Sequence, residues 1–223
     1  MTLGAPEFWT RLVEIGFLNM LLSGDNAVVI ALAVRALPGR QRLLGQLGGT
    51  VGAVVLRLAF VGVVSLLLRV PYLRLVGGLL LIWIAFKLVS PVDDTAGGPR
   101  HAASFWESIW IIVVADITMS LDNVLAVAAA AHGDMLLVAL GIGMSVPIVV
   151  WGSGVLAGLM NRHPWIIWAG GGLLGYVAGD MILEDPAVIG WLGAFAAGLE
   201  YPVPAALAAA LTGIGWRLAR RAS

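Results

Sequence analysis

The chain has 223 residues, of which 60% are hydrophobic and 12% charged, and its 13 Lys and Arg residues balance 13 Asp and Glu residues. Soluble domains have about a quarter of their residues charged, so this composition excludes an ordinary soluble protein and predicts membrane-spanning helices. The neutral balance gives no indication of nucleic-acid binding. The absence of cysteine excludes disulfides, a thiolate metal site and a cysteine nucleophile.

The first apolar run covers residues 8–34 and is preceded by a segment without the basic start or cleavage site of a signal peptide. We therefore expect a retained first span. The run is longer than the roughly 20 residues that cross a bilayer, which predicts a tilted or broken helix. Gly24 is the position where the helix would unwind, and an unbroken helix with a packing glycine is the alternative.

Further apolar runs predict spans over residues 44–68, 75–89, 105–131, 135–159, 165–183 and 205–218. Residues 35–42 form a basic turn between the first two spans. The apolar run 187–199 is short for a crossing and favours a re-entrant or interfacial segment. The prediction is an all-α, polytopic membrane helix bundle with about seven transmembrane helices, and eight crossings is the alternative.

Two segments of the chain resemble each other, which indicates an internal duplication. Ser23-Gly-Asp25-Asn26 corresponds to Ser120-Leu-Asp122-Asn123, and the same offset pairs Asn19 with Asp116. Each copy has three spans, an odd number, so the two copies would insert in opposite orientations as a 3+3 inverted repeat with an additional C-terminal helix. The predicted divisions are a first repeat over 1–90, a linker over 91–104, a second repeat over 105–185, and a short re-entrant or interfacial segment with the final helix over 186–223.

Positively charged residues concentrate on one predicted side of the membrane, which places that side in the cytoplasm. We therefore expect a plasma (inner) membrane protein with its N-terminus outside and its C-terminus cytoplasmic. The basic residues on the predicted cytoplasmic side are Arg35, Arg40, Arg42, Lys87, Arg100, Arg162, Arg217, Arg220 and Arg221.

Ionisable and amide side chains inside apolar spans are costly unless something compensates them, so they indicate a functional site. Their oxygens are hard ligands, suited to Mg²⁺, Ca²⁺ or Mn²⁺. Arg57 lies inside the second span and needs an anionic partner, for which the aspartates are candidates; a snorkelling arginine is the alternative. The candidate metal ligands are Asn19, Asp25, Asn26, Asp116, Asp122, Asn123 and Asp180.

The segments SGDNAVVIALAVR, ADITMSLDNVLAVAAAAHGD and GDMILEDPAV resemble the TerC family of integral membrane proteins, in particular its compact YjbE-type branch. The resemblance covers essentially the whole chain. It implies a relative of the LysE-type exporters and, for characterised members, manganese efflux or tellurium resistance. By motif, the acidic positions of the family correspond to Asp25, Asp116, Asp122 and Asp180. The long extra loops and soluble domains of larger members are absent from this chain.

The sequence thus predicts a membrane exporter of divalent cations, with Mn²⁺ as the expected cargo, alternating access around a mid-membrane site, and proton exchange as a hypothesis for coupling. No catalytic residues and no resident cofactor are predicted; the partners would be the lipid bilayer and the metal ion, and a homo-oligomer is left open. Alternatives are export of another small solute, a non-transport assembly protein, and an intramembrane aspartyl protease using Asp122 and Asp180. The protease is disfavoured because this sequence lacks a Gly-x-Gly-Asp pattern at its aspartates.

Overall fold

The computed structural model describes residues 6–61, 70–90, 104–130 and 134–222, and within these ranges the secondary structure is helical. Residues 6–7, 18, 20–22, 121–130, 135 and 221–222 are described by their backbone alone. The elements are α1 Pro6–Leu22, α2 Gly24–Val34, α3 Gly39–Val61, α5 Leu73–Val89, α6 Phe105–Ala130, α7 Met135–Arg162, α8 Trp165–Leu183, α9 Pro186–Leu192, the 3₁₀ helix η1 Gly193–Phe195, α10 Ala196–Leu199 and α11 Pro202–Ala222.

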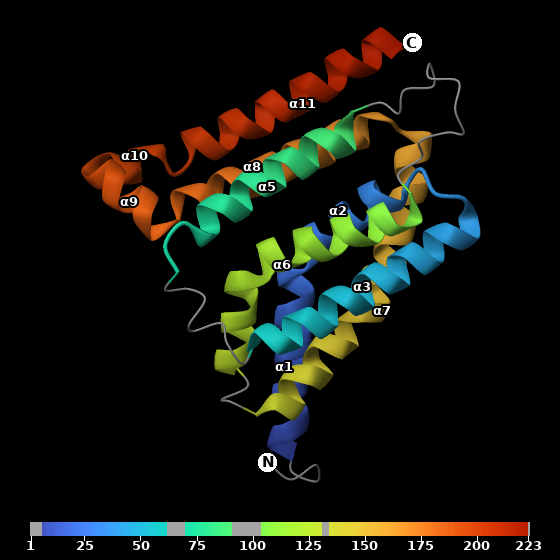
Figure 1. The fold of residues 1–223 in the computed structure, drawn as a ribbon. Coiled ribbons are helices and arrows are strands. Elements are labelled where there is room, and N and C mark those ends of the chain that lie inside the picture. Colours follow the sequence, from blue (N-terminus) through green and yellow to red (C-terminus); the bar gives the residue numbers. More distant parts are fainter. Residues whose placement is uncertain (1–5, 62–69, 91–103, 131–133, 223) are drawn as a thin grey trace.

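The helices form two groups that meet at α2 (Figure 1). In one group, α8 packs against both α5 and α11; in the other, α1 packs against α7, and α3 packs against α6 and α7. Helix α2 contacts α6, α7 and α8, and Val29 to Val34 on it are all buried. An apolar helix that is buried on all sides is typical of the centre of a membrane bundle. The polar residues at the start of α2 are therefore carried into the interior.

The first predicted span is broken close to Gly24, as expected if the helix unwinds there, and the unbroken helix was wrong. Helix α1 ends at Leu22 and α2 begins at Gly24, while Ser23 between them has φ −103° and ψ 8°. No atom lies within 4 Å of the position that a Cβ on Gly24 would occupy, so this glycine is not needed for close packing. The break places Asp25 in the first turn of α2. Figure 1 shows that α6 also changes direction along its length.

Two predicted boundaries were wrong by several residues. The second span was expected to start at residue 44 after a basic turn, but α3 begins at Gly39 and includes Arg40 and Arg42. Exposed charged side chains are compatible with a helix end that extends beyond the hydrocarbon region. The last helix begins at Pro202 instead of residue 205. Proline is tolerated in the first turn because its missing N–H would have no intrahelical partner there.

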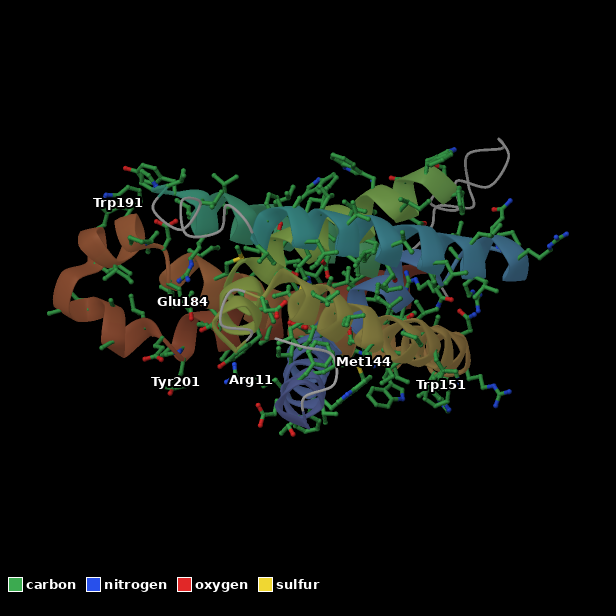
Figure 2. All side chains as sticks on the ribbon, turned by 90° about the horizontal axis from the view of Figure 1, so that it is seen from below. Arg11, Met144, Trp151, Glu184, Trp191 and Tyr201 are labelled. Atoms are coloured by element: carbon green, nitrogen blue, oxygen red, sulfur yellow. The ribbon has the colours of Figure 1, made fainter. Side chains whose placement is uncertain are left out.

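The structure confirms an all-α membrane helix bundle. Of the described helices, Gly39–Val61, Leu136–Arg162 and Trp165–Leu183 are each long and apolar enough to span a bilayer. Residues Pro186–Leu199 and Pro202–Arg220 form a pair bent by 79°, so 187–199 is not part of a straight crossing. Large apolar side chains face outward, among them Trp151 on α7, which is 72% exposed (Figure 2). The count of seven crossings and the inverted repeat stay predictions. The predicted linker covers residues 91–104, and of these, residues 91–103 lie outside the described part of the chain.

Close packing between α8 and α11 depends on Gly179. A Cβ at this position would lie 2.8 Å from the Cα of Pro204, so backbone atoms would have to move. We expect Gly179→Ala to lower the midpoint of thermal unfolding, by an amount corresponding to about 1–3 kcal/mol of overpacking. Gly213 on α11 is the matched control, because nothing lies within 4 Å of its Cβ position. An equal midpoint for the two alanine variants would show that this contact does not limit stability.

Asp185 connects the start of α5 to the start of α9. Its carboxylate accepts hydrogen bonds from the backbone amides of Leu75 at 3.0 Å and Ala187 at 2.8 Å. Burial opposes ionisation, but these amide donors outweigh it and hold the pKa of Asp185 below its ordinary value of 3.8. The stabilisation is therefore complete above pH 3.8 and is lost as pH falls through the lower folded-state pKa. Asp185→Ala should lower stability at neutral pH by about 0.5–2 kcal/mol, which is the usual cost of losing a helix cap. Thermal unfolding scans measure this loss, and equal unfolding midpoints for the variant and the wild type would contradict the prediction.

Candidate metal site

The interior of the bundle contains an arginine held by oxygen atoms from two other helices. Arg57 on α3 is 4% exposed, and its guanidinium donates to Asp116 Oδ1 at 2.6 Å, to the Asn19 amide oxygen at 3.0 Å and to the Ser120 hydroxyl. The Asn19 amide donates in turn to the Ser145 hydroxyl at 2.6 Å. The prediction that an intramembrane aspartate pairs with Arg57 is confirmed, and the snorkelling alternative was wrong.

The local sequence explains why these side chains meet. Asp116 and Ser120 are four residues apart on α6, so they share one face, and the Ser120 hydroxyl also donates to Asp116 at 3.2 Å. Asn19 is on α1, before the break, and is completely buried. The salt bridge between Arg57 and Asp116 therefore joins α3 to α6, and the amide of Asn19 joins α1 to Arg57 on α3 and to Ser145 on α7.

A small cavity of about 20 Å³ lies beside this salt bridge, enough for about one water molecule or ion. Helices α2, α3, α6 and α7 each contribute to its wall. Its polar lining comes from side chains of serine, asparagine, threonine, arginine and aspartate, and the remainder is aliphatic. The polar lining residues are Ser23, Asn26, Thr50, Arg57, Asp116 and Ser145.

Asn26 is the polar residue of the cavity whose hydrogen-bonding capacity is most clearly unused. It is 4% exposed, and neither its amide nitrogen nor its amide oxygen has a hydrogen-bond partner among the described residues. Burying an amide without partners costs about 1–3 kcal/mol in proteins, so a water molecule or an ion at this amide would be favourable. The hydroxyl of Thr50 in the same wall also has no partner among the residues that the structure describes.

Asp25 is half-buried at the N-terminus of α2, next to Asn26, and its carboxylate accepts from the Asn26 backbone amide at 2.8 Å. It interacts electrostatically with both Asp116 and Arg57. Asp25 is not among the residues that line the cavity, whereas Asn26 and Asp116 are. Carboxylate, amide and hydroxyl oxygens of this lining are of the kind that a hard divalent cation takes.

The predicted ligands are only partly brought together in the described residues. Asn26 and Asp116 line the cavity, Asn19 is hydrogen-bonded to its lining residues Arg57 and Ser145, and Asp25 is not among the lining residues. Asp122 and Asn123 are on α6, but their side chains lie outside the description, as do any contacts that they make. Asp180 on α8 is half-buried and does not line the cavity. Considering the described side chains alone, no three acidic or histidine residues converge.

Two serines on α7 were missed in the sequence. Ser145 lines the cavity and accepts from Asn19, while Ser153 accepts from the side chain of Gln46 on α3 at 3.3 Å. They are eight residues apart, so both face the same side of a helix. Two serines at this spacing within an apolar run were the feature of the sequence that could have identified them. Gln46, Thr50 and Arg57 similarly extend a polar stripe along α3.

Comparison with known protein families gives a match over residues 4–222 to the family described as "Integral membrane protein TerC family". The chain belongs to the TerC family. This TerC chain is 42% identical over 179 residues to the Bacillus subtilis "Uncharacterized membrane protein YjbE", covering 80% of this chain and 82% of the relative. It is also 28% identical over 198 residues to the Escherichia coli "UPF0053 inner membrane protein YgdQ", covering 81% and 83%.

Another relative of the TerC chain is the Bacillus subtilis "Uncharacterized membrane protein YceF", 29% identical over 136 residues, which are 57% of this chain and 53% of the relative. No solved structure matches. The family expected from the twin Asp-Asn motifs is thus confirmed, and with it an integral membrane protein. The relatives' names state no substrate, so the cargo has to be argued from the site.

Proposed function

We propose that this protein exports divalent metal cations across the plasma (inner) membrane, with Mn²⁺ as the main cargo. The ion would bind in the cavity between α2, α3, α6 and α7, and access would alternate between the two sides of the membrane. The proposal uses Asp25, Asn26 and Asp116 as ligands, with Asp122 and Asn123 as their expected counterparts on α6. The N-terminus would lie outside and the C-terminus in the cytoplasm, as the distribution of arginines predicts.

The observation that carries this proposal is the unused amide of Asn26 beside the carboxylate of Asp116, inside a bundle of apolar helices. A buried amide oxygen and carboxylates are ligands of the kind that Mn²⁺, Mg²⁺ and Ca²⁺ take. The break at Ser23 supports the same conclusion, because transporters place ion sites at interrupted helices near the bilayer midplane. Asp25 and Asp122, once the ion has left, would be available to carry protons in the other direction.

The size of the cavity favours an ion over a larger solute. A volume of about 20 Å³ is sufficient for a water molecule or a dehydrated cation. An amino acid or another small organic solute is larger than a water molecule, so this conformation favours the ion over the solute-exporter alternative. The protein is proposed to act as a carrier and not as an enzyme, because the polar side chains that line the cavity offer oxygen ligands for an ion.

Transport by purified protein in proteoliposomes tests the proposal. Mn²⁺, Ca²⁺, Mg²⁺ and Zn²⁺ should be compared side by side, with Mn²⁺ expected to be moved fastest. Asp25→Asn should reduce the initial rate of Mn²⁺ movement at least about tenfold, because a charged ligand is lost. Asp134→Asn is the matched control, since Asp134 caps α7 away from the cavity and asparagine also caps helices well. Rates no higher than those of protein-free liposomes for all four ions would overturn the proposal.

A further inference from the structure

The guanidinium of Arg57 occupies a position that resembles that of a bound cation. Its three described acceptors are a carboxylate oxygen of Asp116, the amide oxygen of Asn19 and the hydroxyl oxygen of Ser120. These are oxygen ligands of the class that a hard divalent cation takes. They come from two helices, α1 and α6, that do not carry the arginine. The arginine is thus surrounded much as a metal ion would be.

The salt bridge cannot stay as it is when a divalent cation enters the adjoining cavity. Arg57 and Asp116 both line that cavity, and the two charged groups are 2.6 Å apart. A doubly positive ion bound to Asp116 would be close to a positive guanidinium in a region of low dielectric constant, where repulsion is strong. The metal and the arginine therefore compete for the same carboxylate.

A purely structural role for the pair would not account for its surroundings. A buried salt bridge generally adds little net stability compared with apolar residues of similar size. Here the pair borders a cavity in which the amide of Asn26 has no partner, and the Nε of Arg57 itself has no acceptor among the described residues. The arginine is therefore not fully satisfied in this position, which is consistent with a side chain that changes partners.

We propose that Arg57 is a tethered counter-cation, which neutralises Asp116 while the transport site is empty and is displaced when the metal binds. The inference rests on the proposed function and deepens it by naming the residue that sets affinity and release. Because the metal has to displace Arg57 from Asp116, its affinity for the site is lower than it would be without the arginine. Return of the arginine to Asp116 then drives the ion out. The empty carrier stays neutral at Asp116 without needing a proton there.

Binding of Mn²⁺ to the purified protein in detergent, measured by titration calorimetry, tests this role. Arg57→Gln should bind Mn²⁺ at least about tenfold more tightly than the wild type, because removal of the competing charge removes Coulomb repulsion. Arg57→Leu is the second variant, since leucine has no atom that could ligate the ion. Arg57→Lys keeps the positive charge and should bind Mn²⁺ with an affinity close to that of the wild type. Both neutral variants should also show slower Mn²⁺ movement in proteoliposomes despite tighter binding.

The outcomes separate this inference from the proposed function. Saturable binding by the wild type with equal or weaker binding by the neutral variants would overturn the role of Arg57 and leave the metal site intact. Absence of saturable Mn²⁺ binding by the wild type would overturn the proposed function and this inference together. A structural role alone predicts weaker binding in Arg57→Gln, so tighter binding distinguishes the two. If one neutral variant does not fold, the other decides.

Discussion

An Arg57→Leu variant is expected to lose about 3–5 kcal/mol of stability in the absence of metal, because it leaves the buried carboxylate of Asp116 without its counter-charge. The salt bridge is 2.6 Å long, and the side chains of Arg57 and Asp116 are 5% and 11% exposed. Thermal unfolding of the purified protein in detergent, without added divalent ions, measures the loss. Mn²⁺ should restore more stability in this variant than in the wild type, since binding to the folded state raises its stability.

The double variant Arg57→Leu/Asp116→Leu is the control for this prediction. It removes both charges, so no unpaired charge remains at this pair, and most of the lost stability should return. Mn²⁺ should no longer stabilise it. If the double variant were as unstable as the single one, the loss would come from packing of the arginine stem and not from the unpaired carboxylate.

Asn26→Leu is expected to make the protein more stable and to abolish Mn²⁺ transport. The amide of Asn26 is buried without partners among the described residues, and replacing such a group by an apolar one removes a cost of about 1–3 kcal/mol. Leucine has the same number of side-chain heavy atoms as asparagine, and the adjoining cavity accommodates its larger methyl groups. The same change removes a proposed ligand, so transport should fall to the level of protein-free liposomes. Unfolding scans and the proteoliposome assay measure the two effects on one preparation.

Asn19→Leu is the matched control, because Asn19 is equally buried but its amide is engaged on both sides. It accepts from Arg57 at 3.0 Å and donates to Ser145 at 2.6 Å. Leucine at this position leaves those partners unsatisfied, so stability should fall. If both variants shifted the unfolding midpoint in the same direction, the distinction between an engaged and an unused amide would be wrong.

Much of the fold was predictable from the sequence because a bilayer imposes strong rules. Apolar runs of sufficient length have to form helices, so the sixth span was predicted at residues 165–183 with the same bounds as α8. Helix ends outside the hydrocarbon region follow weaker rules. The starts of α3 and α11 were therefore displaced, since charged residues and prolines there are compatible with either a helix or a turn.

The site was predictable in its residue types but not in its pairing. The cost of polar groups in an apolar run made Asp25, Asn26 and Asp116 candidate ligands without any structure, and Asn26 and Asp116 do line one cavity. The sequence did not reveal which aspartate would face Arg57, because that depends on how α3 and α6 rotate against each other. Nor did it reveal that the amide of Asn26 would have no partner among the described residues, which is a property of the packed bundle.

The central claim is that the cavity beside Asn26 and Asp116 binds a divalent cation. The most direct test is an experimental structure of the wild-type protein with Mn²⁺, using anomalous scattering to locate the metal. The account predicts an anomalous peak in this cavity within roughly 2.0–2.6 Å of the Asn26 amide oxygen and an Asp116 carboxylate oxygen, with Arg57 moved away from Asp116. An ordered Mn²⁺ ion elsewhere in the bundle, with the salt bridge intact and the amide of Asn26 still unoccupied, would contradict it.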